Sequence, residues 1–146
     1  MLETPYILSR TYLLNAETRI PYTKPPWGTL GAVNLIRGDL QFEVPLGTML
    51  DPAEHPEAAE WGSLNLAGPM TTASGLVFVA ASVDDHLRAF DTETGDLLWE
   101  DRLPAGGQAT PMTYAVDGKQ YVVQAAGGHG PLGTKQGDAV VAYALP

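Results

Sequence analysis

Residues 87–104 read LRAFDTETGDLLWEDRLP. Apolar and polar residues alternate on both sides of a short polar turn from Asp91 to Gly95, which is the pattern of a β-hairpin. An aspartate accepts backbone N–H groups across its own turn, and glycine takes the positive φ that a β-carbon resists. Trp99 stands in the second strand, where its indole can be buried against a neighbouring sheet. This stretch predicts two paired strands fastened to another sheet by an aromatic ring.

The hairpin is repeated along the chain. LGAVNLIRGDLQFEVPLG, residues 30–47, aligns with it at an offset of 57 residues. The alignment pairs four positions: Ala32 with Ala89, Asn34 with Asp91, Gly38 with Gly95 and Phe42 with Trp99. A third copy begins in DAVVAYALP, residues 138–146, with Ala142 at the position of Ala89. Two unrelated hairpins with common turn chemistry are the alternative explanation, but shared turn, alanine and aromatic positions favour a true repeat.

Matching apolar runs precede the second and third copies, GLVFVAAS at residues 75–82 and GKQYVVQAA at residues 118–126. One period is therefore four strands over roughly 50 residues, which is the length of a propeller blade. We expect an all-β fold, a partial β-propeller of two to three four-stranded blades. The expected blade parts are residues 25–50, 65–104 and 107–146, and residues 51–64 form an inter-blade loop.

Composition agrees with short strands joined by turns, since the chain has 16 glycines, 12 prolines and 45% hydrophobic residues among 146. The net charge of −9 without any Lys/Arg cluster argues against nucleic-acid binding. The absence of cysteine excludes disulfides and thiolate metal sites. No apolar stretch is long enough to span a membrane, and the first residues do not read as a signal peptide.

The pattern Ala89-x-Asp91-x-x-Thr94-Gly95-x-x-x-Trp99 resembles the tryptophan-docking motif of the quinoprotein dehydrogenases, which carry pyrroloquinoline quinone (PQQ) in an eight-bladed propeller. The resemblance extends over about residues 4–146 and is to the C-terminal part of the membrane-bound glucose dehydrogenase branch. It is carried by PPWGTLGAVNL (25–35), NLAGPMTTASGLVFVAAS (65–82) and RLPAGGQATPMTY (102–114). Eight blades need about 400 residues, so we expect this chain to be a fragment.

The resemblance implies PQQ as cofactor, with Ca²⁺ bound by upstream residues absent here, and a glucose-like sugar or an alcohol as substrate. It implies ubiquinone as the acceptor and a periplasmic parent enzyme, anchored to the inner membrane by a segment outside this chain. We expect no catalytic residue and no metal ligand in these blades, so whether the isolated chain is an enzyme stays open. A noncatalytic propeller scaffold is the alternative, and open blade edges favour self-association.

The glycine-rich stretch AGGHGPLGTKQGD, residues 126–138, is an insertion of about ten residues relative to the preceding copy. By resemblance, His129 lies near the substrate side of the quinone pocket, and Asp84 belongs to the same pocket wall. The remaining residues that the resemblance places at the pocket are Gly128, Gly130, Asn65 and Gly68. The alternatives are a surface histidine, a turn-forming aspartate and ordinary turn residues.

Overall fold

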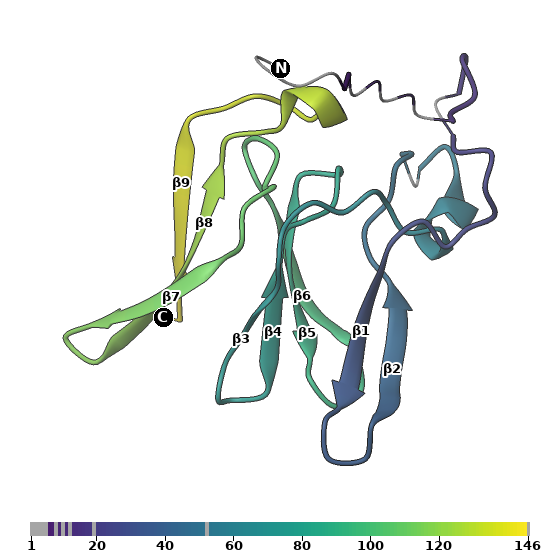
Figure 1. The fold of residues 1–146 in the computed structure, drawn as a ribbon. Coiled ribbons are helices and arrows are strands. Elements are labelled where there is room, and N and C mark those ends of the chain that lie inside the picture. Colours follow the sequence, from purple (N-terminus) through teal and green to yellow (C-terminus); the bar gives the residue numbers. More distant parts are fainter. Residues whose placement is uncertain are drawn as a thin grey trace.

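A computed structural model describes residues 6–7, 9, 11, 13–18, 20–51 and 53–145. The described chain forms three antiparallel sheets and two short 3₁₀ helices, which confirms the all-β prediction (Figure 1). The first sheet contains β1 (Thr29–Asn34) and β2 (Asp39–Pro45). The middle sheet contains β3 (Met70–Thr71), β4 (Leu76–Val79), β5 (His86–Asp91) and β6 (Leu97–Arg102). The last contains β7 (Met112–Val116), β8 (Lys119–Ala126) and β9 (Ala139–Ala144).

The predicted hairpin is formed by β5 and β6. Asp91 Oδ1 accepts the backbone N–H groups of Glu93 at 2.7 Å and Thr94 at 2.9 Å, and Gly95 has a φ of +78°. The hydrogen bonds from the Thr94 and Glu93 N–H groups hold the pKa of Asp91 below its ordinary value. The turn is therefore closed by the side chain and the glycine that the sequence suggested.

The first hairpin, β1–β2, has the same local geometry. Asn34 Oδ1 accepts two backbone N–H groups at 3.0 Å, and Gly38 has a φ of +75°. Ala32 pairs with Phe42 and a bulge follows at once, just as Ala89 pairs with Trp99 ahead of a bulge. The alignment read from the sequence is thus also a structural repeat.

The sheets are stacked face to face because β4 presents apolar residues on both sides. Val77 and Val79 belong to a core shared with the first sheet, whereas Phe78 and Ala80 face a core shared with the last sheet. The first core consists of Leu30, Leu46, Val77, Val79, Ala81 and Phe90, with Phe42 and Val44 packed against it. Blade-like stacking of this kind is the packing of a propeller.

Aromatic rings join successive sheets. Phe42 of β2 lies over the next hairpin so closely that a β-carbon on Gly95 would stand 2.6 Å from its ring. Trp99 of β6 meets Tyr143 of β9 edge-on, with 5.1 Å between ring centroids. The predicted aromatic contact between sheets is present, but the predicted burial of the indole is incomplete, because Trp99 is 38% exposed.

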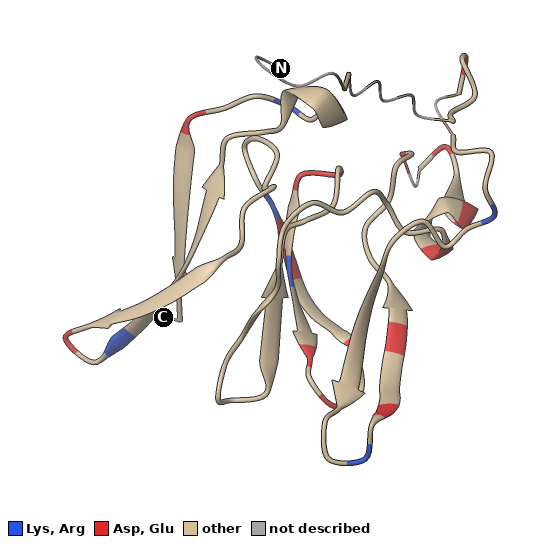
Figure 2. Ribbon diagram, viewed as in Figure 1, with Lys and Arg blue, Asp and Glu red and all other residues tan. Residues whose placement is uncertain are grey.

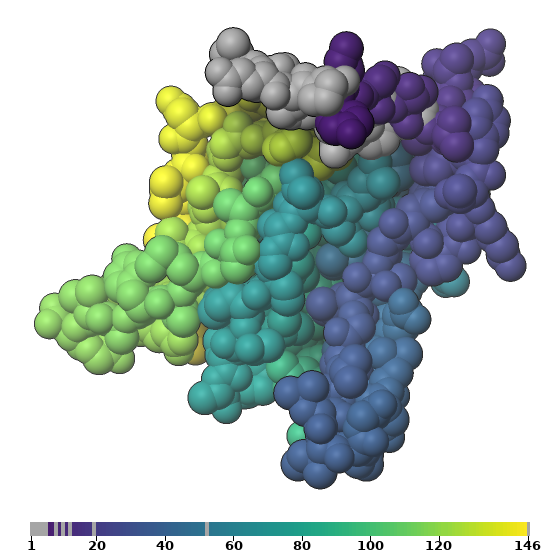
Figure 3. Space-filling model, viewed as in Figure 1, coloured from purple at the N-terminus to yellow at the C-terminus, as the bar shows by residue number. Residues whose placement is uncertain are grey.

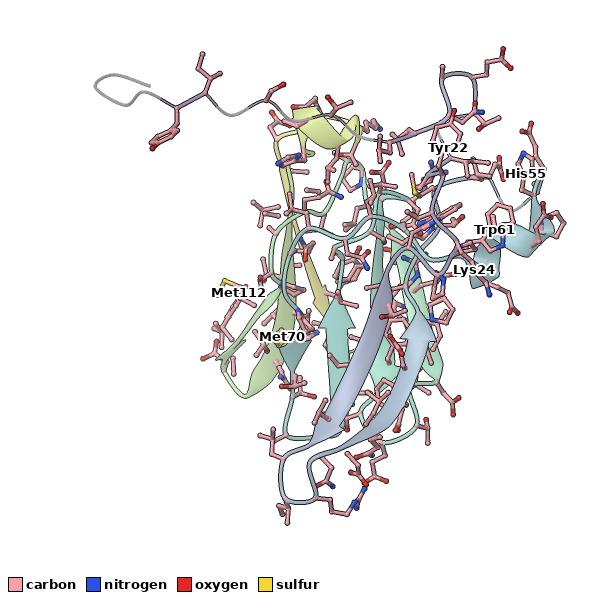
Figure 4. The ribbon with its side chains drawn as sticks, turned by 45° about the vertical axis from the view of Figure 1, so that its right-hand side comes forward. Tyr22, Lys24, His55, Trp61, Met70 and Met112 are labelled. Carbon is pink, nitrogen blue, oxygen red and sulfur yellow. The ribbon has the colours of Figure 1, made fainter. Side chains whose placement is uncertain are left out.

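Trp27 and Trp61, the other two tryptophans, contact each other edge-on at 5.5 Å, and Trp27 Nε1 donates to Thr23 O at 2.8 Å. Trp61 follows the 3₁₀ helix η1 (Pro56–Glu60) and lies near His55, on the opposite side from Met112 (Figure 4). Packing therefore accounts for the pair. Lys and Arg are dispersed over the described ribbon (Figure 2), and no helix within it is long and apolar enough to cross a membrane.

Two glycines in equivalent turns test the aromatic contact. Alanine at either position places a β-carbon in the left-handed region, at a cost of about 1–2 kcal/mol. At Gly95 the carbon also meets the Phe42 ring, whereas at Gly38 it meets nothing within 4 Å. In urea denaturation we expect Gly95→Ala to lower the free energy of unfolding by roughly 1 kcal/mol or more beyond Gly38→Ala, as overpacking does. If the two variants lose the same free energy of unfolding, Phe42 does not pack closely on Gly95 and the contact has no stabilising role.

Candidate functional site

Two connecting loops lie at the same end of the stacked sheets, at the top of Figure 1. One joins β4 to β5 and contains Asp84, and the other joins β8 to β9 and contains His129. Each loop links the second strand of its sheet to the third, so the repeat itself places them together. The inserted glycine-rich stretch, residues 127–138, forms the longer of these loops and includes η2 (Gly130–Leu132).

Hydrogen bonds fasten His129 to the body of the molecule. The His129 N–H donates to Thr134 Oγ1 at 2.7 Å, and this buried hydroxyl donates to Gln108 Oε1 at 2.9 Å. Gln108 Nε2 in turn donates to Ser82 O at 2.8 Å. The imidazole Nδ1 is buried and has no hydrogen-bond partner in the described structure. Its loop is thus held in place while one ring nitrogen remains unused.

Asp84 lies at the other end of this chain of contacts. Ser82 Oγ donates to Asp84 Oδ1 at 2.6 Å, and Arg88 Nη2 donates to Oδ2 at 2.6 Å. The Thr48 N–H also donates to Oδ2, at 3.0 Å. Burial favours the neutral acid, but hydrogen bonds and charge from Arg88, together with Ser82 and Thr48, outweigh it and lower the pKa of Asp84. Asp84 is therefore a largely buried carboxylate in an ion pair.

The two predicted loop glycines differ in their surroundings. Gly128 has a φ of +75°, and a β-carbon there would collide with the Lys135 carbonyl. Its N–H donates to Gly106 O at 2.8 Å, so the loop bends back on the preceding connection. A β-carbon on Gly130 would have only Gln136 Nε2 within 4 Å, at 3.9 Å. Gly128 is required by the backbone, whereas Gly130 leaves open space beside His129.

Asn65 and Gly68 lie on the segment that leads into β3. The Gly68 N–H donates to Thr110 Oγ1 at 3.1 Å, and a β-carbon on Gly68 would come within 3.1 Å of the same oxygen. Asn65 is exposed, and its Oδ1 accepts the Ser63 hydroxyl at 3.4 Å. Packing against Thr110, in the connection that precedes β7, accounts for the small residue at 68. A pocket role for either residue stays a prediction.

A small hollow of about 240 Å³ lies beside the glycine-rich loop. Its walls come from five separate segments of the chain: Leu14, Met49, Leu64, Val83 and residues 131–134. The hollow shares Thr134 with the contacts of His129, so the loop end is a concave surface with a few polar groups.

Thr134, Gln108 and Arg88 were not identified from the sequence. Thr134 and Ser82 each lie 26 positions from their partner Gln108, so no local pattern reveals these contacts. Arg88 lies only four positions after Asp84, but the sequence does not show that the two side chains meet. The available signal was a polar residue within an apolar or glycine-rich run, as for Thr134 between Gly133 and Lys135. Buried polar groups require partners, but the sequence does not say which ones.

Known proteins with similar sequences share this architecture. Residues 1–122 match the family described as "PQQ: Glucose/ethanol/alcohol dehydrogenase, beta-propeller domain". The chain belongs to this family. The quinoprotein glucose dehydrogenase of Escherichia coli is 48% identical over 87% of the chain, and that of Gluconobacter oxydans is 43% identical over 92%. The chain covers 16% and 17% of these two relatives.

A solved structure supports the same fold. The quinohemoprotein alcohol dehydrogenase of Comamonas testosteroni superposes on 89% of the chain with a TM-score of 0.60 and 27% identity. The chain covers 18% of that protein. The propeller prediction is therefore confirmed, and the relatives that the chain matches are about five times its length.

The residues of the loop end determine which kind of cofactor could bind there. The described residues contain no group of three or more His, Asp or Glu side chains that could hold a metal ion. The free Nδ1 of His129 and the open space beside Gly130 suit a flat, polar ligand approached by backbone. Family membership implies PQQ as the cofactor of the propeller to which the chain belongs.

The Asp84–Arg88 pair predicts a specific pH dependence. Because the folded pKa of Asp84 is lowered, its stabilisation is fully present above the unfolded value of about 3.9. It is lost as pH falls through the lower folded value. We expect Asp84→Asn to reduce the free energy of unfolding by about 3 kcal/mol at neutral pH, and by progressively less in acid, measured by urea denaturation. Asp39→Asn, in the exposed Arg37–Asp39 pair, is the control and should change little.

A second prediction concerns the loop. Thr134→Val leaves the His129 N–H and the Gln108 side chain without their buried partner, at a cost of about 1–3 kcal/mol. We expect hydrogen–deuterium exchange across residues 127–137 to accelerate by about tenfold or more. Thr134→Ser keeps the hydroxyl and should exchange like the parent chain. Identical exchange in both variants would show that the hydroxyl does not hold the loop.

Proposed function

We propose that this chain is the C-terminal part of the propeller of a PQQ-dependent dehydrogenase that oxidises a glucose-like sugar or a polyol. Family membership and 48% identity to a quinoprotein glucose dehydrogenase support the cofactor and the substrate class. Relatives named for quinate/shikimate and glycerol dehydrogenases are 42% and 40% identical, so polyols belong to the same proposal. In the parent enzyme these blades form one part of the pocket wall.

The observation that carries the proposal is the loop end. His129 is anchored through its backbone to Thr134, yet its buried Nδ1 has no partner. A buried nitrogen without a hydrogen bond is costly unless a ligand supplies one. A noncatalytic scaffold has no need for such a group at the mouth of a propeller.

Each pocket residue has a distinct role in this proposal. His129 hydrogen-bonds a substrate hydroxyl or a cofactor oxygen through its free ring nitrogen, and Gly128 and Gly130 allow the backbone to approach closely. The Asp84 carboxylate, held by Arg88, contributes fixed negative charge to the same wall. Asn65 and Gly68 belong to the neighbouring segment, which leads into β3, and line the pocket from there. PQQ, when bound, supplies the two-electron acceptor for alcohol oxidation.

The remaining machinery belongs to other segments of the parent protein. We assign the general base and the Ca²⁺ ligands to blades outside residues 1–146, and ubiquinone to the role of electron acceptor. We place the parent enzyme in the periplasm, anchored to the inner membrane. The docking of Trp99 on the next sheet is the family's tryptophan motif in this proposal, with Asp91 and Gly95 as its turn residues. Open sheet edges favour self-association of the isolated chain.

A chimera tests the proposal. This chain replaces the matching part of the Escherichia coli enzyme, which is 16% of that protein. We expect PQQ-dependent dye reduction with glucose or another sugar or polyol. His129→Leu should lower kcat/KM about tenfold or more, the equivalent of one hydrogen bond of about 1.5 kcal/mol. Lys135→Ala, in the same loop, should change little.

The isolated chain with added PQQ and Ca²⁺ is the second control, and we expect it to reduce no dye because the base lies elsewhere. A chimera that binds PQQ but oxidises no sugar or polyol would refute the proposed function. Unchanged kinetics in His129→Leu would refute the role of His129 alone.

A further inference from the structure

One glutamine side chain connects the two loops of the candidate site. Gln108 is partly buried in the connection between β6 and β7, next to the glycine-rich loop that Figure 3 shows in yellow-green at the top of the molecule. Its Oε1 accepts the Thr134 hydroxyl at 2.9 Å, and its Nε2 donates to Ser82 O at 2.8 Å. The first contact leads to the backbone of His129, and the second leads to the loop that contains Asp84.

The hydrogen bonds through Gln108 run in one direction. Ser82 O is a carbonyl oxygen and can only accept, so the amide nitrogen of Gln108 faces it and the amide oxygen faces Thr134. The Thr134 hydroxyl gives its one proton to that oxygen and accepts the His129 N–H through a lone pair. Turning the amide over would set its oxygen against Ser82 O, so the orientation of the side chain is fixed.

The main chain on both sides of Gln108 is fixed as well. Gln124 of β8 is fully buried, and its Nε2 donates to Gly107 O at 3.1 Å and to Ala109 O at 2.9 Å. A β-carbon on Gly106 would collide with Gln108 Oε1, so the amide lies directly against a glycine that leaves room for it. The side chain therefore has the rigid base that is needed to position another residue.

The blade fold itself does not require a glutamine at this position. Pro-Met-Thr at residues 111–113 repeats Pro-Met-Thr at residues 69–71, and in this alignment Leu66 stands where Gln108 does. Leu66 is 46% exposed, and its backbone N–H donates to Ala81 O at 2.9 Å. The polar link is therefore present in the copy whose loop carries the glycine-rich insertion, and it serves that loop.

We propose that Gln108 is a positioning residue that acts through His129. Its amide fixes the Thr134 hydroxyl, and that hydroxyl fixes the backbone of His129 and with it the free imidazole Nδ1. Because the same amide is tied to Ser82 O, the position of His129 depends on the loop that holds Asp84. The inference rests on the proposed function, in which His129 binds a substrate hydroxyl or a cofactor oxygen, and it adds a residue that acts without touching the ligand.

Gln108→Glu in the chimera with the Escherichia coli enzyme tests this role. The substitution keeps the acceptor for Thr134 but sets a carboxylate oxygen against Ser82 O. We expect kcat/KM to fall about tenfold, as in His129→Leu. In the His129→Leu background the same substitution should lower kcat/KM by less than about twofold, because the residue through which it acts is gone. Gln136→Glu adds the same charge at an exposed position of the loop and should change little.

Two kinetic results would overturn the inference. One is unchanged kinetics in Gln108→Glu. The other is an effect of equal size with and without His129, which is what a glutamine that supports only the fold would give.

Amide exchange in the 146-residue chain tests the same contact without PQQ or substrate. We expect Gln108→Glu to accelerate exchange of the His129 N–H about tenfold or more and to leave the amides of β8 unchanged. Gln136→Glu should exchange like the parent chain. Unchanged exchange at His129, or equal acceleration across β8, would overturn the inference. If the unsubstituted chimera oxidises no sugar or polyol, the proposed function fails, and the exchange rates still decide whether Gln108 holds His129.

Discussion

The structure depends on one packing constraint, that the middle sheet is covered on both faces. β4 and the residue after it meet this constraint by placing Val77 and Val79 on one side and Phe78 and Ala80 on the other. A strand with apolar residues on both faces cannot be left exposed to water, so the neighbouring sheets are required for stability. The contact of Phe42 with the next turn adds direction to this packing, because its ring fits only where Gly95 has no β-carbon.

The same stacking creates the candidate site. Face-to-face sheets bring their second-to-third strand loops to one end, where a short loop contains Asp84 and a long one contains His129. Polar groups then join the loops: Thr134 and Gln108 connect His129 to Ser82, and Ser82 contacts Asp84. Rigid strands position the loops, and buried hydrogen bonds orient the side chains, as at many binding sites.

Asp84 illustrates how a functional and a structural reading can apply to one residue. The sequence placed it in a pocket wall by resemblance, and the structure shows its two oxygens receiving Arg88, Ser82 and the Thr48 N–H. A carboxylate held in this way is a source of fixed charge. Gly68 is similar, because its small size already serves the contact with Thr110. Structural need at these positions neither requires nor excludes contact with a ligand.

The sequence by itself determined the strands, the turns and the repeat, because alternation and Asx–glycine turns are local properties of the chain. It also located the inserted loop through the unequal spacing of the copies. Only the tertiary structure decided that Thr134 anchors His129, that Arg88 pairs with Asp84 and that Trp99 is left partly uncovered. Thr134 and Arg88 lie only five and four residues from His129 and Asp84, but the loop conformations that bring these side chains together depend on distant segments such as Gln108 and Thr48. Contacts of that kind leave no local pattern.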